Sequence, residues 1–335
     1  AATIVHHIDV GGGAAGSYYP AAQEVYQEGL RIPPCKVVEA GKPNQAVIAI
    51  IRQNSREPEQ IGGDFQSQLA AMEIGGQALR KLAARYGAEV LQAAMDELQN
   101  QSDRAMRAML RELPDGTYRF TDYVDDDGIT DDRLKLECAV TIEGDRCLVD
   151  FSGSSPQAAG PVNCTLNMTA SGIYCALAML ADGKVMANSG AYRAIEIVAE
   201  EGTVVSARAP APVANRMATG HRVVTTVLGA LAQAAPDRVP AAYYGVSYVQ
   251  TLSTPDPATG APRVYFEIEM GGWGAHPEQD GADALSAGFH NSSSTPVELN
   301  EAYFPLTFTE YSLIPDSGGN GKQRGGTGLR RAYRL

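Results

Sequence analysis

Two histidines and an aspartate stand directly before a glycine run near the start of the sequence, in the order His6-His7-Ile8-Asp9-Val10-Gly11-Gly12-Gly13. Only three other histidines occur in the 335 residues, so this segment is the most concentrated set of groups for metal binding or acid–base chemistry. The preceding residues 3–5 are β-branched and mostly apolar, which predicts a strand that ends where the glycines begin. The sequence therefore indicates a site at the end of this first strand.

Strand geometry leaves the choice among these residues open. Side chains alternate between the two faces of a strand, so His7 and Asp9 share one face and His6 lies on the other. Zinc takes roughly four ligands and manganese roughly six, so this segment alone completes a site for neither metal. The histidines that could add a ligand, or be ordinary loop and core residues, are His221, His276 and His290. Alternatively, the polar side chains satisfy each other or nearby backbone groups at the strand end.

Three other segments resemble known motifs but lack essential residues. The glycines at 11–16 fit G-x-G-x-x-G, yet a Tyr/Pro segment follows instead of a helix start, which disfavours a dinucleotide site. In 318–323, Gln323 replaces the Ser or Thr that holds magnesium in a phosphate-binding loop. An acidic turn would place Tyr123 and Leu134 at the first and last ligand positions of a calcium loop. We therefore expect no ATP site on this chain.

The charge and hydropathy patterns limit the partners of the protein. The formal net charge is −12, and no basic patch is present that could neutralise the phosphates of nucleic acid or of an anionic membrane. No stretch approaches the roughly 20 apolar residues of a membrane-spanning helix, and no basic leader or signal-peptide core is present. We therefore expect a cytoplasmic protein with no nucleic-acid or membrane partner.

The spacing of apolar residues predicts a mixed fold. Apolar residues three and four apart predict helix over 64–113, divided in two by Gly87, and alternation around turns predicts antiparallel strands over 118–151. Further strands are expected at 46–51, 195–207, 241–251 and 264–270, and buried helices at 168–180 and 219–234. The expected fold is α+β in two regions. Residues 1–115 hold the metal-site strand and the helical part, and 116–335 form a β-rich second half with two buried helices and long glycine-rich loops.

Segments over nearly the whole chain follow one family pattern in order and spacing. They are 6–12 with 16–17, 26–34, 54–56, 63–65, 150–153, 160–163, 271–275 with 280–281, 296–298, and 316–319 with 324–328. Together they resemble the hydantoinase B or N-methylhydantoinase B family, whose members are components of ATP-dependent hydantoinases. This family is related to 5-oxoprolinases and to the large subunits of acetone and acetophenone carboxylases.

The resemblance implies an assembly of two kinds of subunit. A hydantoinase A-like partner binds ATP and phosphorylates the oxygen of a cyclic amide, such as a hydantoin, 5-oxoproline or another lactam, or of a ketone. The hydantoinase B component then contributes a metal-centred site that completes hydrolysis or carboxylation. The resemblance thus places ATP on the partner and implies a hetero-oligomer.

The resemblance also assigns residues to the metal site. The first histidine of the family's H-x-x-D-[VI]-G-G pattern corresponds to His6, so the resemblance favours His6 as the ligand, helped by Asp9, with His7 as the alternate. Zinc is the favoured metal and manganese the alternative. Family members carry a further His/Asp motif upstream that contributes metal ligands, so the resemblance implies that this chain is a fragment of a longer subunit.

The main hypothesis is a metal-containing hydantoinase B component of an ATP-dependent cyclic amide hydrolase. The closest enzymatic alternative is a component of a ketone carboxylase, and an alternative of another class is a non-catalytic scaffold whose glycine loops bind the partner. The glycine-flanked Asp280, Asp316 and Arg324 fit a substrate or interface loop, although turn chemistry explains them about as well.

Overall fold

The computed structural model describes residues 3–181, 183–256, 259–286, 288 and 290–335, and it confirms a mixed α+β fold with a β-rich second half. The helices are α1 (Gln45–Gln53), α2 (Pro58–Tyr86), α3 (Ala88–Arg111), α4 (Leu166–Leu180), α5 (Met217–Leu231) and α6 (Val297–Tyr303). The strands are β1 (Val38–Glu39), β2 (Lys42–Pro43), β3 (Gly116–Val124), β4 (Leu134–Glu143), β5 (Arg146–Asp150), β6 (Ile195–Val198), β7 (Tyr248–Pro255), β8 (Pro262–Glu269), β9 (Thr307–Leu313) and β10 (Leu329–Arg334).

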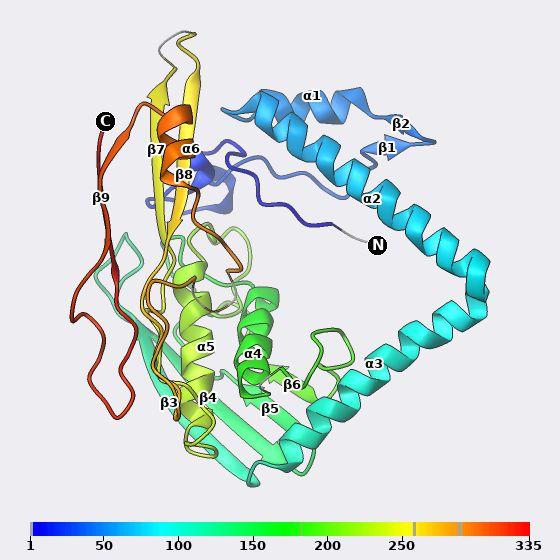
Figure 1. Cartoon of the computed structure of the whole chain (residues 1–335), viewed down its shortest axis with the longest axis vertical. Coiled ribbons are helices and arrows are strands. Elements are labelled where there is room, and N and C mark those ends of the chain that lie inside the picture. The colour runs from blue at the N-terminus through cyan, green and yellow to red at the C-terminus, as the bar shows by residue number, and fades with distance from the viewer. Residues whose placement is uncertain (1–2, 182, 257–258, 287, 289) are drawn as a thin grey trace.

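A four-stranded sheet in the order β3-β4-β5-β6 forms the main body of the fold. The first three strands are antiparallel, as the alternating pattern predicts, and β6 joins β5 in parallel after a crossover that contains α4. Figure 1 shows α4 and α5 side by side on one face of this sheet. Their apolar faces and the inward side chains of β4 and β5 form the hydrophobic core, including Leu136, Val149, Ile173, Leu177 and Val227.

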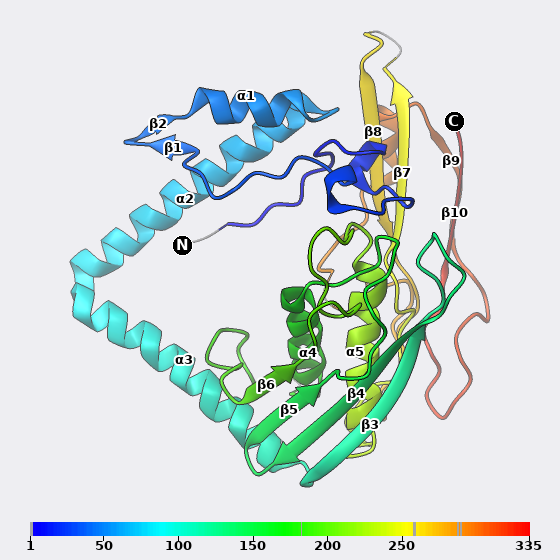
Figure 2. The same ribbon diagram turned by 180° about the vertical axis from the view of Figure 1, so that it is seen from behind.

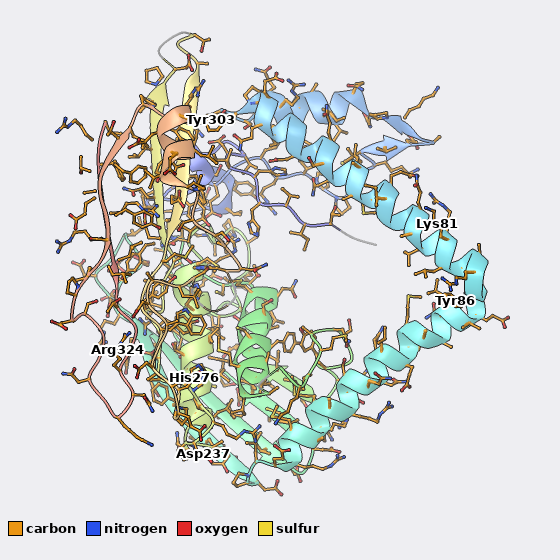
Figure 3. All side chains as sticks on the ribbon, in the orientation of Figure 1. Lys81, Tyr86, Asp237, His276, Tyr303 and Arg324 are labelled. Carbon is orange, nitrogen blue, oxygen red and sulfur yellow. The ribbon has the colours of Figure 1, made fainter. Side chains whose placement is uncertain are left out.

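Helices α2 and α3 form a bent arm that connects the N-terminal segment to the sheet (Figures 1 and 2). The predicted division at Gly87 is confirmed, because this glycine has a φ of +89° and joins the two helices. Figure 3 places Tyr86 at this bend. The arm begins earlier than the apolar pattern indicated, since Pro58 occupies the first helical turn, where its missing N–H is not needed.

The structure differs from the sequence-based prediction in the first 60 residues. The β-branched segment 46–51 is helix α1, not a strand, and the Asn44 side chain caps it by accepting a hydrogen bond from the Val47 N–H at 3.4 Å. Residues 3–10 form no strand. The contact that holds this segment is a single backbone hydrogen bond from the Leu30 N–H to the Val10 carbonyl at 2.9 Å, followed directly by the glycines.

The last third of the chain contains more regular structure than the glycine-rich sequence indicated. The strand predicted at 241–251 begins only at Tyr248, and β7 pairs with β8 in an antiparallel hairpin. Helix α6 and the antiparallel pair β9–β10 follow, where only loops were expected. The prediction failed at β9 and β10 because these strands are short and pair across 15 intervening loop residues, from 314 to 328.

Two leucines of α4 provide a test of this core. Leu177 has no exposed surface, whereas Leu166 on the same helix is 45% exposed. Leu177→Ala should lower the free energy of unfolding by about 2–5 kcal/mol, because the lost side chain leaves a cavity. Leu166→Ala should change it by less than about 0.5 kcal/mol. Urea unfolding followed by circular dichroism measures both values, and equal losses would contradict the described packing.

Candidate functional site

The carboxylate of Asp9 is completely buried and holds the N-terminal glycine loop together. Its Oδ1 accepts hydrogen bonds from the backbone N–H of Gly11 at 3.0 Å and of Arg56 at 2.9 Å. Its Oδ2 accepts from the N–H of Gly16 at 3.0 Å and from Nη1 of Arg56 at 2.9 Å. Both oxygens are thus engaged by neutral and cationic donors, which fits a structural anchor better than a metal ligand.

The Arg56 guanidinium extends this anchor across the loop. It donates to the Ala14 carbonyl at 3.0 Å and to the Gly12 carbonyl at 2.9 Å, and Ser55 Oγ donates to the Asp9 carbonyl at 2.9 Å. A Cβ at Gly12 would lie 2.7 Å from the Gln27 carbonyl oxygen, so a glycine is required there. The sequence contained Ser55 and Arg56 only as a family segment, and no local pattern linked them to Asp9, which precedes Ser55 by 46 residues.

His7 has the geometry of an oriented histidine. Its Nδ1 lies 2.8 Å from Oδ2 of Asp64, and its ring stacks on Phe65 with centroids 5.4 Å apart. The His7 side chain is 16% exposed, and among the described residues no hydrogen bond engages its Nε2. A carboxylate that fixes one imidazole nitrogen and leaves the other available is the usual arrangement of a metal-binding or proton-transferring histidine. His6, by contrast, is exposed.

The residues within the described ranges do not complete a metal site. Nowhere in those ranges do three or more His, Cys, Asp or Glu side chains gather so that they could hold an ion. His276 lies beside the end of α5 that is remote from the N-terminal segment (Figure 3). His221 and His290 contact each other, with no hydrogen bond or ring contact to His6 or His7 among the described residues. Any metal at His7 would therefore need further ligands from elsewhere.

A buried cluster of polar side chains surrounds His221, a residue of α5 with no exposed surface. Its Nδ1 lies 3.0 Å from the Tyr243 hydroxyl, and its Nε2 lies 2.8 Å from Nε2 of His290 and 3.3 Å from Oγ of Ser247. His290 Nε2 also contacts Ser247 Oγ. Burial lowers the pKa of His221 from 6.5 to about 3, with further lowering by the neighbouring His290 and Arg222, and burial also lowers the pKa of His290. Both rings are therefore neutral at pH 7.

The glycine-rich loops of the last third hold one another closely. The Arg324 guanidinium lies 2.8 Å from Asp283 and its backbone N–H donates to Asp280 at 2.9 Å, which joins two of the residues that the sequence singled out. The hydrogen bonds from Arg324 keep the pKa of Asp283 below its usual range. Asp316 is exposed, with a φ of +55° in a turn. This arrangement explains Asp280 and Arg324 as loop-closing residues at the surface.

A cavity of about 340 Å³ lies where the N-terminal loop meets β7. Its lining residues are Tyr18, Tyr19, Pro20, Ala214, Asn215, Ser247, Tyr248, Val249 and Thr251. The loop is fitted tightly against this strand, since a Cβ at Gly16 would lie 2.7 Å from Cγ2 of Thr251. The segment that carries His7 and Asp9 thus continues directly into the wall of this cavity.

No helix in the described part of the chain has the length and continuous apolar character needed to cross a bilayer.

Comparison with known proteins identifies the family. The family model for hydantoinase B/oxoprolinase matches residues 1–335. The chain is 35% identical over 341 residues to a putative D-/L-hydantoinase component, the hydantoinase B protein of Pseudomonas sp. (strain NS671), covering 98% of this chain and 57% of that protein. The ATP-dependent caprolactamase from Pseudomonas jessenii matches in structure with a TM-score of 0.88 at 33% identity, over 97% of this chain and 57% of that chain.

A nucleotide-free acetone carboxylase matches with the same TM-score of 0.88 at 20% identity, covering 98% of this chain and 46% of that chain, and this supports the fold alone. The fold and the oriented histidine thus define a mixed α+β protein with a candidate site at its N-terminal glycine loop. The chain belongs to the hydantoinase B/oxoprolinase family. It spans little more than half of the first relatives it matches, 57% and 58% of their lengths.

The anchor can be tested at single backbone amides. Asp9→Asn removes the charge that faces Arg56 and replaces one acceptor oxygen by a donor, so the N–H groups of Gly11, Gly16 and Arg56 should lose protection in hydrogen–deuterium exchange. The expected loss is about ten- to a hundredfold, as for one or two hydrogen bonds to a charged group at about 1.5–3 kcal/mol each. Asp64→Asn is the matched control and should leave these amides protected. Unchanged protection in Asp9→Asn would contradict the anchor.

The buried histidines predict how stability depends on pH. Since the pKa of His221 falls from 6.5 in the unfolded chain to about 3 in the folded protein, the unfolded chain binds more protons between these pH values. The free energy of unfolding should therefore decrease as the pH is lowered from about 6.5 towards 3. Urea titrations at several pH values measure this slope, and His221→Gln should make it shallower. An equal slope in both proteins would show that His221 does not titrate as described.

Proposed function

We propose that this chain is the hydantoinase B-type component of an ATP-dependent cyclic amide hydrolase of hydantoinase or oxoprolinase type. The observation that carries the proposal is the His7–Asp64 pair beside a glycine loop anchored by Asp9, in a chain that the family model matches along its whole length. The names of two relatives, a hydantoinase and a caprolactamase, each describe one subunit of a larger enzyme. They support a hetero-oligomer with a hydantoinase A-like, ATP-binding partner.

The chemistry explains why two subunits would cooperate. An unstrained amide is a poor electrophile, and phosphorylation of its oxygen by ATP on the partner turns that oxygen into a leaving group. A divalent metal, zinc in first place and manganese as the alternative, would polarise the intermediate or lower the pKa of a bound water. The role of this chain is then to hold one imidazole in a fixed orientation and to enclose the substrate.

Within this proposal His7 is the metal-binding histidine. The Asp64 carboxylate accepts the proton of Nδ1, which leaves the lone pair of Nε2 for a metal. Asp9, whose oxygens already accept four hydrogen bonds, positions the loop instead. The family resemblance favoured His6, which is exposed, and the geometry supports its neighbour. The remaining ligands would come from parts of the assembly beyond the described residues.

Two alternative functions lead to different measurements. A component of a ketone carboxylase would couple ATP cleavage to bicarbonate and ketone consumption, and the acetone carboxylase match supports only the shared fold. A scaffold would bind the partner without contributing to chemistry. The C-terminal loops around Arg324 are candidates for such a surface, although Arg324 already closes onto Asp283 and Asp280.

The test compares three variants in the complete complex with its co-purifying partner. His7→Ala should lose the bound metal and ATP-dependent hydrolysis of hydantoin, caprolactam or 5-oxoproline. Asp64→Asn should lower metal affinity about 10- to 100-fold, because the orienting carboxylate is lost. His6→Ala is the matched control and should retain metal and activity. Metal analysis by mass spectrometry and an assay of ring opening provide the two readouts.

The outcomes separate the hypotheses. Loss in His6→Ala with retention in His7→Ala would return the ligand to His6 and overturn the assignment of His7. Full metal content and activity in all three variants would exclude a metal function for the segment. Bicarbonate-dependent ATP cleavage with a ketone, without ring opening, would favour the carboxylase. Partner binding without either reaction would favour the scaffold.

A further inference from the structure

The cavity beside the N-terminal loop has an uncharged wall. Among the described residues that line it, the polar side chains are those of tyrosines, Asn215, Ser247 and Thr251, and none is Asp, Glu, Lys, Arg or His. A carboxylate placed in such a cavity would lose water without gaining a cationic partner, which disfavours its binding strongly. A neutral ring with amide N–H and C=O groups loses much less and can be satisfied by hydroxyl and amide side chains. The wall therefore fits an uncharged polar ligand.

Ser247 is the lining residue that the structure holds most firmly. It is 6% exposed, and its Oγ lies 3.3 Å from Nε2 of His221 and in contact with Nε2 of His290. These imidazoles come from α5 and from the loop after Trp273, so the hydroxyl lies where three separate segments meet. A serine hydroxyl on an open wall would rotate freely, whereas this one has fixed partners.

The proton arrangement in this cluster makes the Ser247 hydroxyl a donor for a ligand. Two neutral imidazole nitrogens 2.8 Å apart attract each other only if one carries a hydrogen. Nδ1 of His290 is buried and has no hydrogen-bond partner among the described residues, so a proton on Nε2 is the less costly tautomer. His290 Nε2–H then donates towards His221 Nε2 and Ser247 Oγ. The Ser247 hydrogen is left to point either at His221 or into the cavity.

We propose that this cavity binds the uncharged ring of a cyclic amide, with the Ser247 hydroxyl donating to a ring carbonyl oxygen and the His221–His290 pair positioning that hydroxyl. The inference rests on the proposed function and specifies its substrate class. It assigns to this chain neutral hydantoins and simple lactams and excludes ring amides that carry a carboxylate, such as 5-oxoproline. Ser247 is the substrate-contacting residue, and His221 and His290 act through it.

The five histidines of the chain make this inference measurable by NMR without any turnover. Nitrogen-15 spectra of the histidine rings should show neutral His221 and His290 at pH 7. Titration with hydantoin or caprolactam should shift these two sets of signals and leave those of His6 and His276 in place as internal controls. The same titration with 5-oxoproline should shift neither pair.

Calorimetry on two variants adds a quantitative test. Ser247→Ala should weaken binding of caprolactam about five- to tenfold, as expected for one lost neutral hydrogen bond. His290→Gln should weaken it less, because the hydroxyl remains but is no longer held. Thr251→Val, at another lining position of the cavity, is the matched control with retained affinity. The titration of the unaltered chain stands even if Ser247→Ala does not fold.

Four outcomes would overturn the inference. Binding of 5-oxoproline as tight as that of caprolactam would contradict the uncharged substrate class. Shifts confined to His6 and His7 would place the ligand elsewhere, and the absence of any binding would remove the cavity as a site. Stoichiometric zinc uptake lost in His290→Gln would make the pair a metal site instead. In each case ATP-dependent ring opening by the complete complex, which depends on His7, decides the proposed function separately.

Discussion

The contact between the buried Asp9 carboxylate and Arg56 determines the geometry of everything that we assign to function. One charged group accepts four hydrogen bonds and thereby fixes the backbone at Gly11 and Gly16 and the start of α2. Because a buried carboxylate without its cation would be very costly, the loop has one stable arrangement and not many. That arrangement presents His7 before the loop and Tyr18 and Tyr19 after it.

The two candidate sites are therefore connected by one short segment of chain. His7 lies beside Asp64 of α2, and the residues from Tyr18 to Pro20 form part of the cavity wall against β7. A partner that delivers an activated amide to the cavity would meet the histidine through the same rigid loop. This proximity in the sequence gives the metal-site proposal and the ligand proposal a common physical basis, although each has its own test.

Glycine has two different roles in this protein. At Gly12 and Gly16 it allows positive φ and a close approach of backbone and side chains in the N-terminal loop. In the last third it lets loops lie directly on one another: a Cβ at Gly272 would lie 2.0 Å from the Gly326 carbonyl oxygen, and one at Gly274 would lie 2.0 Å from that of Ala241. Loops whose composition suggests flexible binding surfaces are thus packed in part against each other.

The sequence by itself determined the long helices divided at Gly87, the antiparallel strands of 118–151 and the two buried helices, because each follows from local spacing of apolar residues and from turn chemistry. It also pointed to the segment His6–Asp9. Only the tertiary structure paired Asp9 with Arg56, His7 with Asp64, and His221 with His290, since these partners are 47, 57 and 69 residues apart. The packing of the whole chain likewise made 46–51 a helix and left residues 3–10 without a strand. Periodicity records which face of an element is buried, but the partner that buries it is decided by how the whole chain packs.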